Sequence, residues 1–291
     1  MKTAIVTNFN IYDKAYAALR VADKLHELGC EVFVGSFNRD KIARLKGDPR
    51  GYIRYIPIEE IYEASDMIAV LGGDGTILES ARRAAPAGVP IIGINLGRIG
   101  YMAELELDEL DRLSEVVGGN YTLDKRMMIR VDVSDRDGKK KFSSYAVNDA
   151  VISNGSIARI IDLALYEGGS LISNYRSDGI IISTPTGSTA YSMSAGGSVV
   201  DPRVDCICVT PICPHALGSR PIIFPKTAEI EVKNICQREK MIFLTLDGRV
   251  NQEISFGDTV KITRSELETN LIRIKNNCFY SQLRKKMNLN V

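Results

Sequence analysis

The sequence is poor in the residues that usually build metal centres. Its 291 residues include only two histidines, His26 and His215, and no tryptophan. Of its six cysteines, only Cys206, Cys208 and Cys213 lie close together, and no second pair stands at metal-ligand spacing. We therefore interpret the cysteines as reduced thiols in apolar surroundings rather than as a metal cluster.

Net charge and long apolar segments are also lacking. Lys and Arg number 37 against 36 for Asp and Glu, so the net charge of +1 gives no overall basic field to attract nucleic acid or an anionic membrane. The longest apolar runs, such as 67–71 and 91–94, are far shorter than the ~20 residues of a membrane helix, and residues 1–8 do not form a signal peptide pattern. We expect a cytoplasmic protein that binds neither nucleic acid nor membrane and holds any anion locally.

The first third of the chain has the pattern of a mostly parallel sheet with helices. Short apolar runs predict strands, and apolar residues at three- or four-residue spacing predict helices between them. The expected strands are 4–6, 31–34, 66–71 and 91–94, and the expected helices are 12–28 and 77–85. Alternation of this kind is typical of an α/β domain, which we place at residues 1–120.

Beyond residue 120 the pattern changes to the alternation of a β-rich domain. Apolar residues recur at every second position from 129 to 133, a turn follows at Asp137-Gly138, and a second apolar stretch runs from 142 to 147. Further strands are expected at 160–166, 179–183, 229–232, 241–246 and 259–263. We place this second domain at residues 121–265.

A glycine-rich loop follows the expected strand 66–71. Gly72, Gly73, Gly75 and Thr76 can bring backbone N–H groups close to a phosphate. The loop is neither a lysine-bearing P-loop nor a dinucleotide fingerprint, and its one functional side chain is the carboxylate of Asp74. Asp74 is suited to accepting a proton from a hydroxyl or to holding a divalent metal, as phosphoryl transfer to an alcohol requires. The alternative is that Asp74 only caps the following helix.

A second candidate site lies where an expected strand, 179–183, runs into hydroxyl-bearing and small residues. Tyr191 can stack on a purine, while the hydroxyls and exposed amides of Thr186, Thr189 and Ala190 can bond a base edge or a ribose. A helix is expected to begin at Thr189 or Ala190. Because clusters of Ser, Thr, Gly and Pro usually form loops, a purely structural role is the alternative.

Carboxylates elsewhere in the chain suit a sugar or a base better than a phosphate. Asn148 and Asp149 form an amide and carboxylate pair that could read base edges and ribose hydroxyls, or could make a turn. If Asp149 and Asp178 met Asp74 in one pocket, they would repel a pyrophosphate by several kcal/mol. Arg159 and Arg176 are the candidates for offsetting that repulsion.

In identity, order and spacing, these motifs resemble the NAD kinase family across nearly the whole chain. The motifs are Gly72-Gly73-Asp74-Gly75-Thr76, Asn148-Asp149, Arg176-Ser177-Asp178-Gly179, the run 184–192 and Gly196-Gly197. The resemblance implies a Rossmann-like α/β domain, then a β-sandwich-like domain, with residues 266–291 returning to pack on the first. It also implies a kinase that transfers the terminal phosphoryl group of ATP to the 2′-hydroxyl of the adenosine ribose of NAD, with Mg²⁺ or another divalent ion, and that forms a homodimer or homotetramer.

By the same resemblance, Asp74 is the general base, and a set of residues that includes Asp74 is expected to bind NAD. They are Asp74, Gly75, Asn148, Asp149, Arg159, Arg176, Asp178, Thr186, Thr189, Ala190, Tyr191, Ser192, Ser194 and Cys213. The chain departs from the family at Asp149, where many members have Glu, at Glu79, where some carry a basic residue, and at Asp201 and Arg249.

Two other functions fit parts of the pattern. A lipid kinase resembling the diacylglycerol kinases would share the glycine loop, but the run 184–192 argues against it. A dinucleotide sensor without catalysis would use the same scaffold but would have no need for a proton acceptor at Asp74.

Overall fold

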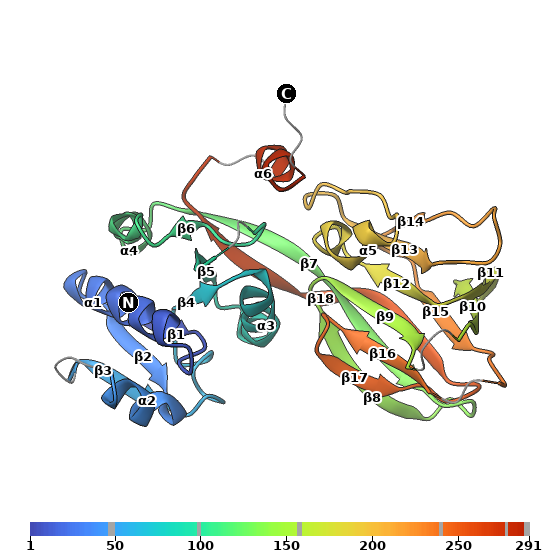
Figure 1. Ribbon diagram of the computed structural model, residues 1–291, viewed down its shortest axis with the longest axis horizontal. Helices are drawn as coiled ribbons and strands as arrows, with labels where there is room; N and C mark the ends of the chain where they lie inside the picture. The colour runs from blue at the N-terminus through green and yellow to red at the C-terminus, as the bar shows by residue number, and fades with distance from the viewer. Residues whose placement is uncertain (46–49, 98–99, 156–158, 239–240, 277–278, 288–291) are drawn as a thin grey trace. The chain divides into compact units, whose positions relative to one another are not determined.

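The computed structural model describes residues 1–45, 50–97, 100–155, 159–238, 241–276 and 279–287 (Figure 1). The chain divides into two compact units. Unit 1 contains residues 1–125 together with 269–291, and unit 2 contains residues 126–268. In the described part of the chain, none of the helices combines the length and the apolar character that crossing a membrane would require.

Unit 1 is built on a parallel sheet in the order β5-β4-β1-β2-β3. Its strands are β1 (Lys2–Val6), β2 (Glu31–Gly35), β3 (Ile53–Ile56), β4 (Met67–Gly72) and β5 (Ile91–Asn95), and the short β6 (Leu105–Glu106) also pairs with β5. All six residues of β4 are buried, as expected for a central strand covered on both faces.

Several helices of unit 1 contribute apolar residues to one core, and the last helix has no buried residue among those described. The main helices are α1 (Tyr12–Glu27) and α3 (Asp74–Ala84), and the shorter ones are α2 (Arg39–Ala43), α4 (Leu113–Val117) and α6 (Phe279–Lys286). Leu19, Ala22 and Leu25 of α1 are buried at helical spacing against strands β2 and β4. Gly29, with a φ of 79°, ends the helix in the left-handed conformation that glycine adopts easily.

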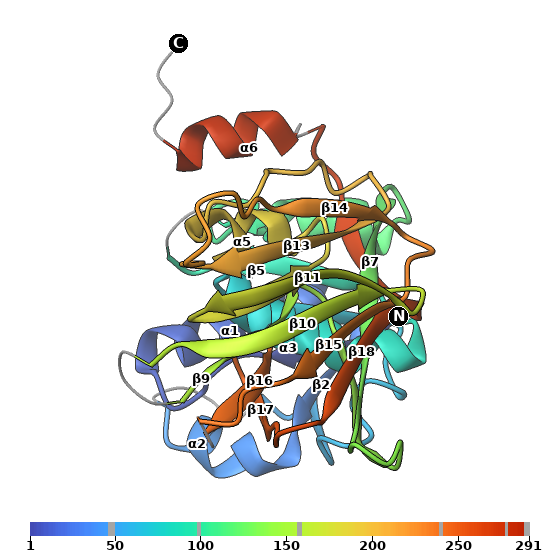
Figure 2. The same cartoon turned by 90° about the vertical axis from the view of Figure 1, so that its right-hand side faces the viewer.

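Unit 2 consists of antiparallel strands. One sheet has the order β14-β13-β12-β9-β16-β17, and the other contains β11-β10-β15-β18, with β7 paired to β18 and to β8 (Figure 2). The strands are β7 (Thr122–Ser134), β8 (Lys140–Ala146), β9 (Asp149–Asn154), β10 (Ile161–Glu167), β11 (Ser170–Ser177), β12 (Gly179–Ser183), β13 (Cys206–Ile212), β14 (Ile222–Pro225), β15 (Ile230–Asn234), β16 (Ile242–Leu246), β17 (Val250–Glu253) and β18 (Thr259–Arg273). Helix α5 (Tyr191–Ser194) is a single turn.

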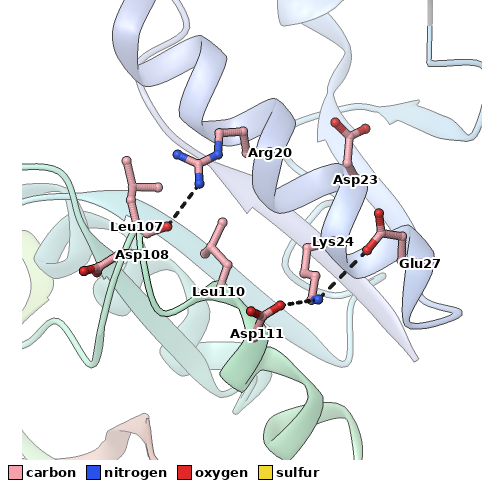
Figure 3. A pocket seen from close by; sticks show the side chains of 8 residues that line it. All are labelled: Arg20, Asp23, Lys24, Glu27, Leu107, Asp108, Leu110 and Asp111. Atoms are coloured by element: carbon pink, nitrogen blue, oxygen red, sulfur yellow. Dashed lines mark hydrogen bonds and ion pairs between the residues drawn. The ribbon is translucent and has the colours of Figure 1, made fainter.

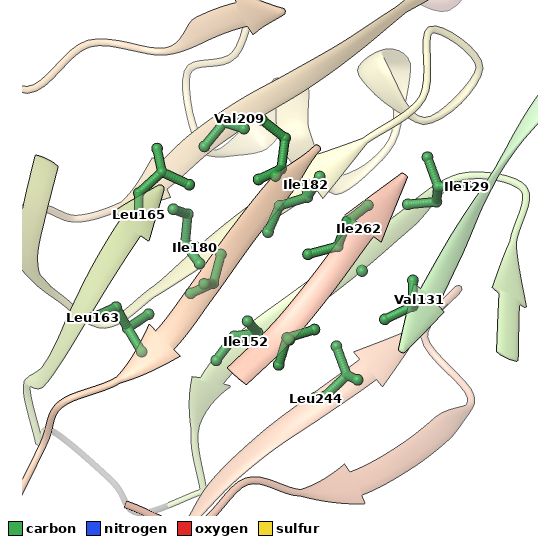
Figure 4. Close-up of a cluster of buried hydrophobic side chains, with 14 of the residues drawn as sticks. Ile129, Val131, Ile152, Leu163, Leu165, Ile180, Ile182, Val209, Leu244 and Ile262 are labelled. Carbon is green, nitrogen blue, oxygen red and sulfur yellow. The ribbon is translucent and has the colours of Figure 1, made fainter. Parts of the chain in front are cut away.

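The core of unit 2 is formed by alternate residues of strands from both sheets. Ile129 and Val131 of β7, Ile180 and Ile182 of β12, and Leu244 of β16 belong to one cluster of buried side chains (Figure 4). Along β7 the spacing of two residues gives the strand one apolar face, which explains why the alternation from 129 to 133 is visible in the sequence.

The β7 and β18 strands contribute residues to both units. The last part of β18 returns to unit 1, where Leu271 pairs with Ile91 of β5 in parallel register. Ile272 lies in the core of unit 1. The α/β plus β fold class expected from the sequence, with a C-terminal segment that returns to the first domain, is therefore confirmed.

Several elements differ from the sequence prediction. Strands β3, β6, β9, β11, β13, β14 and β17 were not expected, and α3 begins at Asp74 rather than at residue 77. The early start of α3 was hidden because Gly75 within its first turn has a poor intrinsic helix propensity. The helix expected from Thr189 or Ala190 is only the single turn of α5, preceded by the short 3-10 helix of residues 187–189.

Candidate functional site

Asp74 is the first residue of α3 and follows the carboxyl end of β4 by two positions. Its carboxylate does not cap the helix. Oδ2 accepts a hydrogen bond from the backbone N–H of Tyr101 at 3.0 Å, and Oδ1 accepts one from Met102 at 3.1 Å. The capping alternative is therefore wrong, and the side chain is oriented by a separate loop of unit 1. With 32% of the side chain exposed, the carboxylate is open to a ligand.

The loop that holds Asp74 depends on a glycine. A Cβ added at Gly100 would lie 2.0 Å from Oδ1 of Asp74, a distance that excludes any other residue without a shift of the loop or the carboxylate. Gly100, Tyr101 and Met102 were not selected as site residues from the sequence. A glycine beside two apolar residues gives no chemical signal, so only the fold reveals their role.

Arg273, the last residue of β18, holds the same loop through its backbone carbonyls. Its guanidinium donates to the backbone carbonyls of Tyr101, Met102 and Ala103 at 3.2 to 3.4 Å. It also forms an ion pair with Glu104 at 3.1 Å, and the side chain of Glu104 is 1% exposed. The amides that orient Asp74 are therefore anchored to the segment that returns from unit 2.

The negative charge of Glu79, one helical turn after Asp74, is neutralised locally. Arg83 and Arg82 lie 2.6 and 3.1 Å from its carboxylate. Burial alone would raise the pKa of Glu79, but the hydrogen bonds from Arg83 and Arg82 lower it below its usual value. The charge of Glu79 is thus paired within α3 and is not directed at the glycine loop.

In unit 2, the turn before β9 is held by a carboxylate that the sequence analysis did not select. Asp247 accepts hydrogen bonds from the backbone N–H groups of Val147, Asn148 and Asp149 at 2.8 to 3.1 Å. Asp247 has a φ of 50°, a left-handed conformation that Asp tolerates better than most residues. The three bonds fix the backbone from which the side chains of Asn148 and Asp149 project.

Both side chains of this pair are in unusual environments. Burial, together with the charge of Asp247, raises the pKa of Asp149 to about 7. The buried Oδ1 of Asn148 has no hydrogen-bond partner among the described residues. Since buried polar atoms in proteins are nearly always paired, an unpartnered amide oxygen beside a carboxyl of raised pKa is typical of a ligand site.

The segment after β12 packs on the same turn. The backbone N–H of Thr184 donates to the carbonyl of Asn148 at 2.9 Å, and the Thr184 hydroxyl donates to the carbonyl of Val147 at 2.6 Å. A Cβ added at Gly187 would lie 2.1 Å from the carbonyl oxygen of Asn148, so this close approach requires glycine. The fold thus brings together the two motifs 148–149 and 184–191.

Within that segment, the predicted contact residues are not equally available. Tyr191 is 47% exposed, so its ring does not belong to the core, and Ser194 is exposed as well. Thr186 and Thr189 are buried, and the amide of Ala190 donates to the carbonyl of Gly187.

The prediction that the backbone amide of Ala190 is exposed is therefore wrong, because this N–H donates a hydrogen bond within the 3-10 turn. Buried Arg126 donates to the hydroxyl of Thr186, whose backbone carbonyl accepts from Thr189. Ser192 is fully buried, with its hydroxyl 3.0 Å from that of Thr210, so it supports the segment from inside.

The remaining predicted residues lie at the other end of β12. The N–H of Asp178 donates to the carbonyl of Ile212, which places Asp178 beside Cys213, and Arg176 precedes it on β11. Asn154 links Arg159 to this group. Its side-chain amide donates to the backbone carbonyl of Arg159, and its backbone N–H donates to the carbonyl of Asp178.

Both Arg176 and Asp178 are exposed and alternate with buried residues, as expected for one face of an extended segment. A strand of five residues rises roughly 14 Å. Asp149 and Asp178 therefore lie at opposite ends of β12 and do not form one cluster of carboxylates.

Comparisons with known proteins identify the family. A family model described as the ATP-NAD kinase N-terminal domain matches residues 4–120, and one described as the ATP-NAD kinase C-terminal domain matches residues 147–274. The chain belongs to the NAD kinase family. The resemblance seen in the sequence is confirmed, and the lipid kinase alternative is set aside.

Two relatives illustrate the level of similarity within the NAD kinase family. An NAD kinase of Geobacter metallireducens is 42% identical over 230 residues, which cover 79% of this chain and 81% of the relative. An NAD kinase of Aromatoleum aromaticum is 36% identical over 285 residues, covering 98% of this chain and 92% of the relative.

Solved structures of the family share the fold. A crystal structure of yeast NADH kinase complexed with NADH has a TM-score of 0.91 and 25% identity, and the match covers all of this chain and 88% of that one. An NAD kinase from Archaeoglobus fulgidus in complex with ATP has a TM-score of 0.73 and 26% identity, with both chains fully covered. Like these relatives, the chain is a kinase with an α/β unit and a mostly β unit.

Two surface pockets of this family member lie apart from the residues discussed above. One, in unit 1, has a volume of about 290 Å³ and is lined by α1 and the region 107–111, including the ion pair between Lys24 and Asp111 (Figure 3). The other, in unit 2, has about 390 Å³ and includes Lys139 to Lys141. Lys140 and Lys141 form ion pairs with Asp132 and Asp258, so the charges of these two lysines are paired within the protein.

Metal-ligating side chains do not gather in the described part of the molecule. Across those residues there is no group of three or more His, Cys, Asp or Glu side chains that could hold a metal ion. The five described cysteines are free thiols, and Cys278 lies outside the described residues. A magnesium ion bound mainly through nucleotide phosphates needs only one or two carboxylates from the protein, which Asp74 could supply.

Proposed function

We propose that this NAD kinase family member transfers the terminal phosphoryl group of ATP to the 2′-hydroxyl of the adenosine ribose of NAD, with Asp74 as the general base. The observation that carries the proposal is the orientation of Asp74. Its carboxylate is fixed by the amides of Tyr101 and Met102, is partly exposed, and takes no part in capping α3. A carboxylate held in this way has acceptor capacity left for a substrate hydroxyl.

The glycine loop supplies the second requirement. Residues 72–76 run from the last residue of β4 into the first turn of α3. Backbone amides at the start of a helix favour an anion. Phosphoryl transfer depends mainly on positioning and on electrostatic stabilisation of the phosphates. We therefore assign Gly72, Gly73, Gly75 and Thr76 to the donor phosphates. A divalent ion carried by ATP would neutralise phosphate charge when bound, and Asp74 is the carboxylate of this loop that would hold it.

The dinucleotide is assigned to unit 2. The unpartnered amide oxygen of Asn148 and the buried carboxyl of Asp149 suit a ribose or base edge, and the exposed ring of Tyr191 suits an adenine face. At the other end of β12, Asp178 with Arg159, Arg176 and Cys213 are proposed for a more distant part of the ligand. The homodimer or homotetramer and the cytoplasmic location expected from the sequence belong to the same proposal, and sedimentation would test the assembly.

The deciding experiment is an end-point assay with ATP, Mg²⁺ and NAD, read with an NADP-specific dehydrogenase. We expect Asp74→Asn to retain the fold and NAD binding while losing roughly 10²–10⁴-fold in turnover, the usual share of a general base. Asp40→Asn, a change at an exposed carboxylate of α2, is the control and should leave turnover unaltered. Turnover retained by Asp74→Asn would remove Asp74 as the base, and NAD binding without any NADP would favour a dinucleotide sensor.

A further inference from the structure

The last helix of unit 1 places a lysine beside Asp74. Nζ of Lys286, at the end of α6, lies 3.6 Å from Oδ2 of Asp74 and 4.0 Å from the centroid of the Tyr101 ring. At the other end of the helix, Phe279 packs on the same ring with centroids 6.1 Å apart. Both ends of α6 therefore contact Tyr101, the residue whose amide orients Asp74.

The ion pair between Lys286 and Asp74 is of a kind that can be exchanged for another ion pair. The distance of 3.6 Å is that of an ion pair and not of a hydrogen bond, and the side chains of Lys286 and Asp74 are 39% and 32% exposed. Partly exposed ion pairs contribute little to stability and are screened by salt. None of the described residues of α6 is buried, so a small movement of the helix or of Lys286 would uncover no core.

A donor triphosphate at the glycine loop would need a cation in this place. A P-loop carries its own lysine, but residues 72–76 offer backbone amides, the Thr76 hydroxyl and the negative Asp74, without a cation. A triphosphate close to a carboxylate is repelled unless a positive charge lies nearby. Arg82 and Arg83 are engaged with Glu79, while Lys286 already lies within ion-pair distance of Asp74.

We propose that Lys286 is a phosphate-binding residue for the donor triphosphate, held on Asp74 in the nucleotide-free protein and transferred to the phosphates when the donor binds. The transfer exchanges one ion pair for another and releases Oδ2 of Asp74 for the acceptor hydroxyl. The inference rests on the proposed function to the extent that the triphosphate must lie at the glycine loop.

The test measures ATP binding to the full chain by calorimetry in the absence of NAD, so that no turnover is needed. Because a charge-assisted hydrogen bond to phosphate is lost, we expect Lys286→Met to weaken ATP binding by about tenfold. Lys286→Arg, which keeps the charge, should stay within about threefold of the unmodified protein. Lys285→Met, at the neighbouring exposed lysine of the same helix, is the matched control and should bind ATP normally.

Other results would overturn the inference. Unchanged ATP affinity in Lys286→Met would place Lys286 away from the donor, and an equal loss in Lys285→Met would mean that only the general charge of α6 matters. The NADP assay separates this inference from the proposed function. A protein whose ATP binding depends on Lys286 but which forms no NADP would refute the function alone, whereas NADP formation with ATP affinity indifferent to Lys286 would refute the inference alone.

Discussion

At the scale of single residues, Asp149 illustrates how a site can retain a costly side chain. Its carboxyl is 5% exposed and lies near the charge of Asp247, which is needed to hold the turn 147–149. Ionising a buried group next to a second negative charge is unfavourable, which is why its pKa is raised to about 7. Such a residue makes the folded state less stable as the pH rises.

The first prediction concerns this pH dependence. Because the pKa of Asp149 is higher in the folded chain than in the unfolded one, its contribution to stability is fully present below about pH 4 and is lost as the pH rises through 7. Asp149→Asn removes the titration, so its free energy of unfolding relative to the unmodified protein should increase by roughly 2 to 3 kcal/mol between pH 5 and pH 8. Urea denaturation at both pH values measures the difference. A difference that is the same at pH 5 and pH 8 would contradict the raised pKa.

The second prediction concerns Tyr191. Its exposed ring is proposed to stack on adenine, so Tyr191→Ala should raise the dissociation constant for NAD by a factor corresponding to about 1–3 kcal/mol and lower turnover less. Calorimetric titration with NAD is the measurement. Tyr121→Ala removes an exposed tyrosine of unit 1 and serves as the control. Equal affinity in both variants would exclude a stacking role for Tyr191.

Residues that carry chemistry in the sequence were easier to predict than residues that position them. Asp74 stands out because three glycines surround a single carboxylate, and the motif 148–149 stands out as an amide beside a carboxylate. Gly100 and Arg273 do not, since their roles arise from contacts between segments about 27 and 170 positions apart in the chain, which no local pattern encodes. The same holds for Asp247, which binds amides about 100 residues earlier.

At the scale of elements, β18 has two roles. Its early residues pair with β15 in unit 2, and its end supplies Arg273 to the loop of unit 1 that orients Asp74. Glu104 accepts hydrogen bonds from the backbone of Ile274 and Lys275 in addition to its ion pair with Arg273. The loop 100–104 is therefore held by one strand end through several polar contacts.

The third prediction follows from that arrangement. Arg273→Met should lower the free energy of unfolding by about 3 kcal/mol, because it leaves the charge of Glu104 buried without its cation. It should also reduce turnover, since the amides that orient Asp74 lose their support. Arg54→Met breaks an exposed ion pair with Glu31 and should cost less than about 1 kcal/mol. Equal losses in the two variants, measured by urea denaturation, would show that burial of the Glu104 pair is unimportant.

Elements with strong periodicity were predictable, whereas several strands at the edges of the sheets and some inside them were not. The alternation from 129 to 133 predicted β7, and the turn at Asp137-Gly138 predicted its pairing with β8, where Gly138 has a φ of 82°. Strand β11 was missed because its residues 170–174 are mostly exposed, and polar and apolar side chains do not alternate along them. Strand β13 was missed because its apolar run is interrupted by Thr210 and Pro211, and a proline inside a run argues against a strand.

At the scale of the whole molecule, unit 1 is discontinuous in the chain. Residues 1–125 form most of it, but residues 269–291 supply the strand end beside β5 and the core residue Ile272. A polypeptide that ends before this segment would lack a neighbour for β5 and the cation that pairs with Glu104. The two parts of unit 1 therefore depend on each other.

The fourth prediction tests this dependence. A fragment of residues 1–125 should have a lower urea midpoint than the same fragment joined to residues 269–291 by a flexible linker, because Ile91 of β5 loses its pairing with Leu271 and the core loses Ile272. Circular dichroism during urea denaturation measures both midpoints. Matching midpoints would mean that residues 1–125 form a complete folding unit without the returning segment.

The position of Arg273 also has a consequence for protein synthesis. A ribosome releases residues in chain order, so Asp74 and the loop 100–104 emerge well before the arginine that fixes the loop, about 170 residues later. During that interval the amides that orient the proposed proton acceptor lack the support of Arg273. A chain that ended before residue 273 would therefore contain the reacting carboxylate without the arginine that holds its loop.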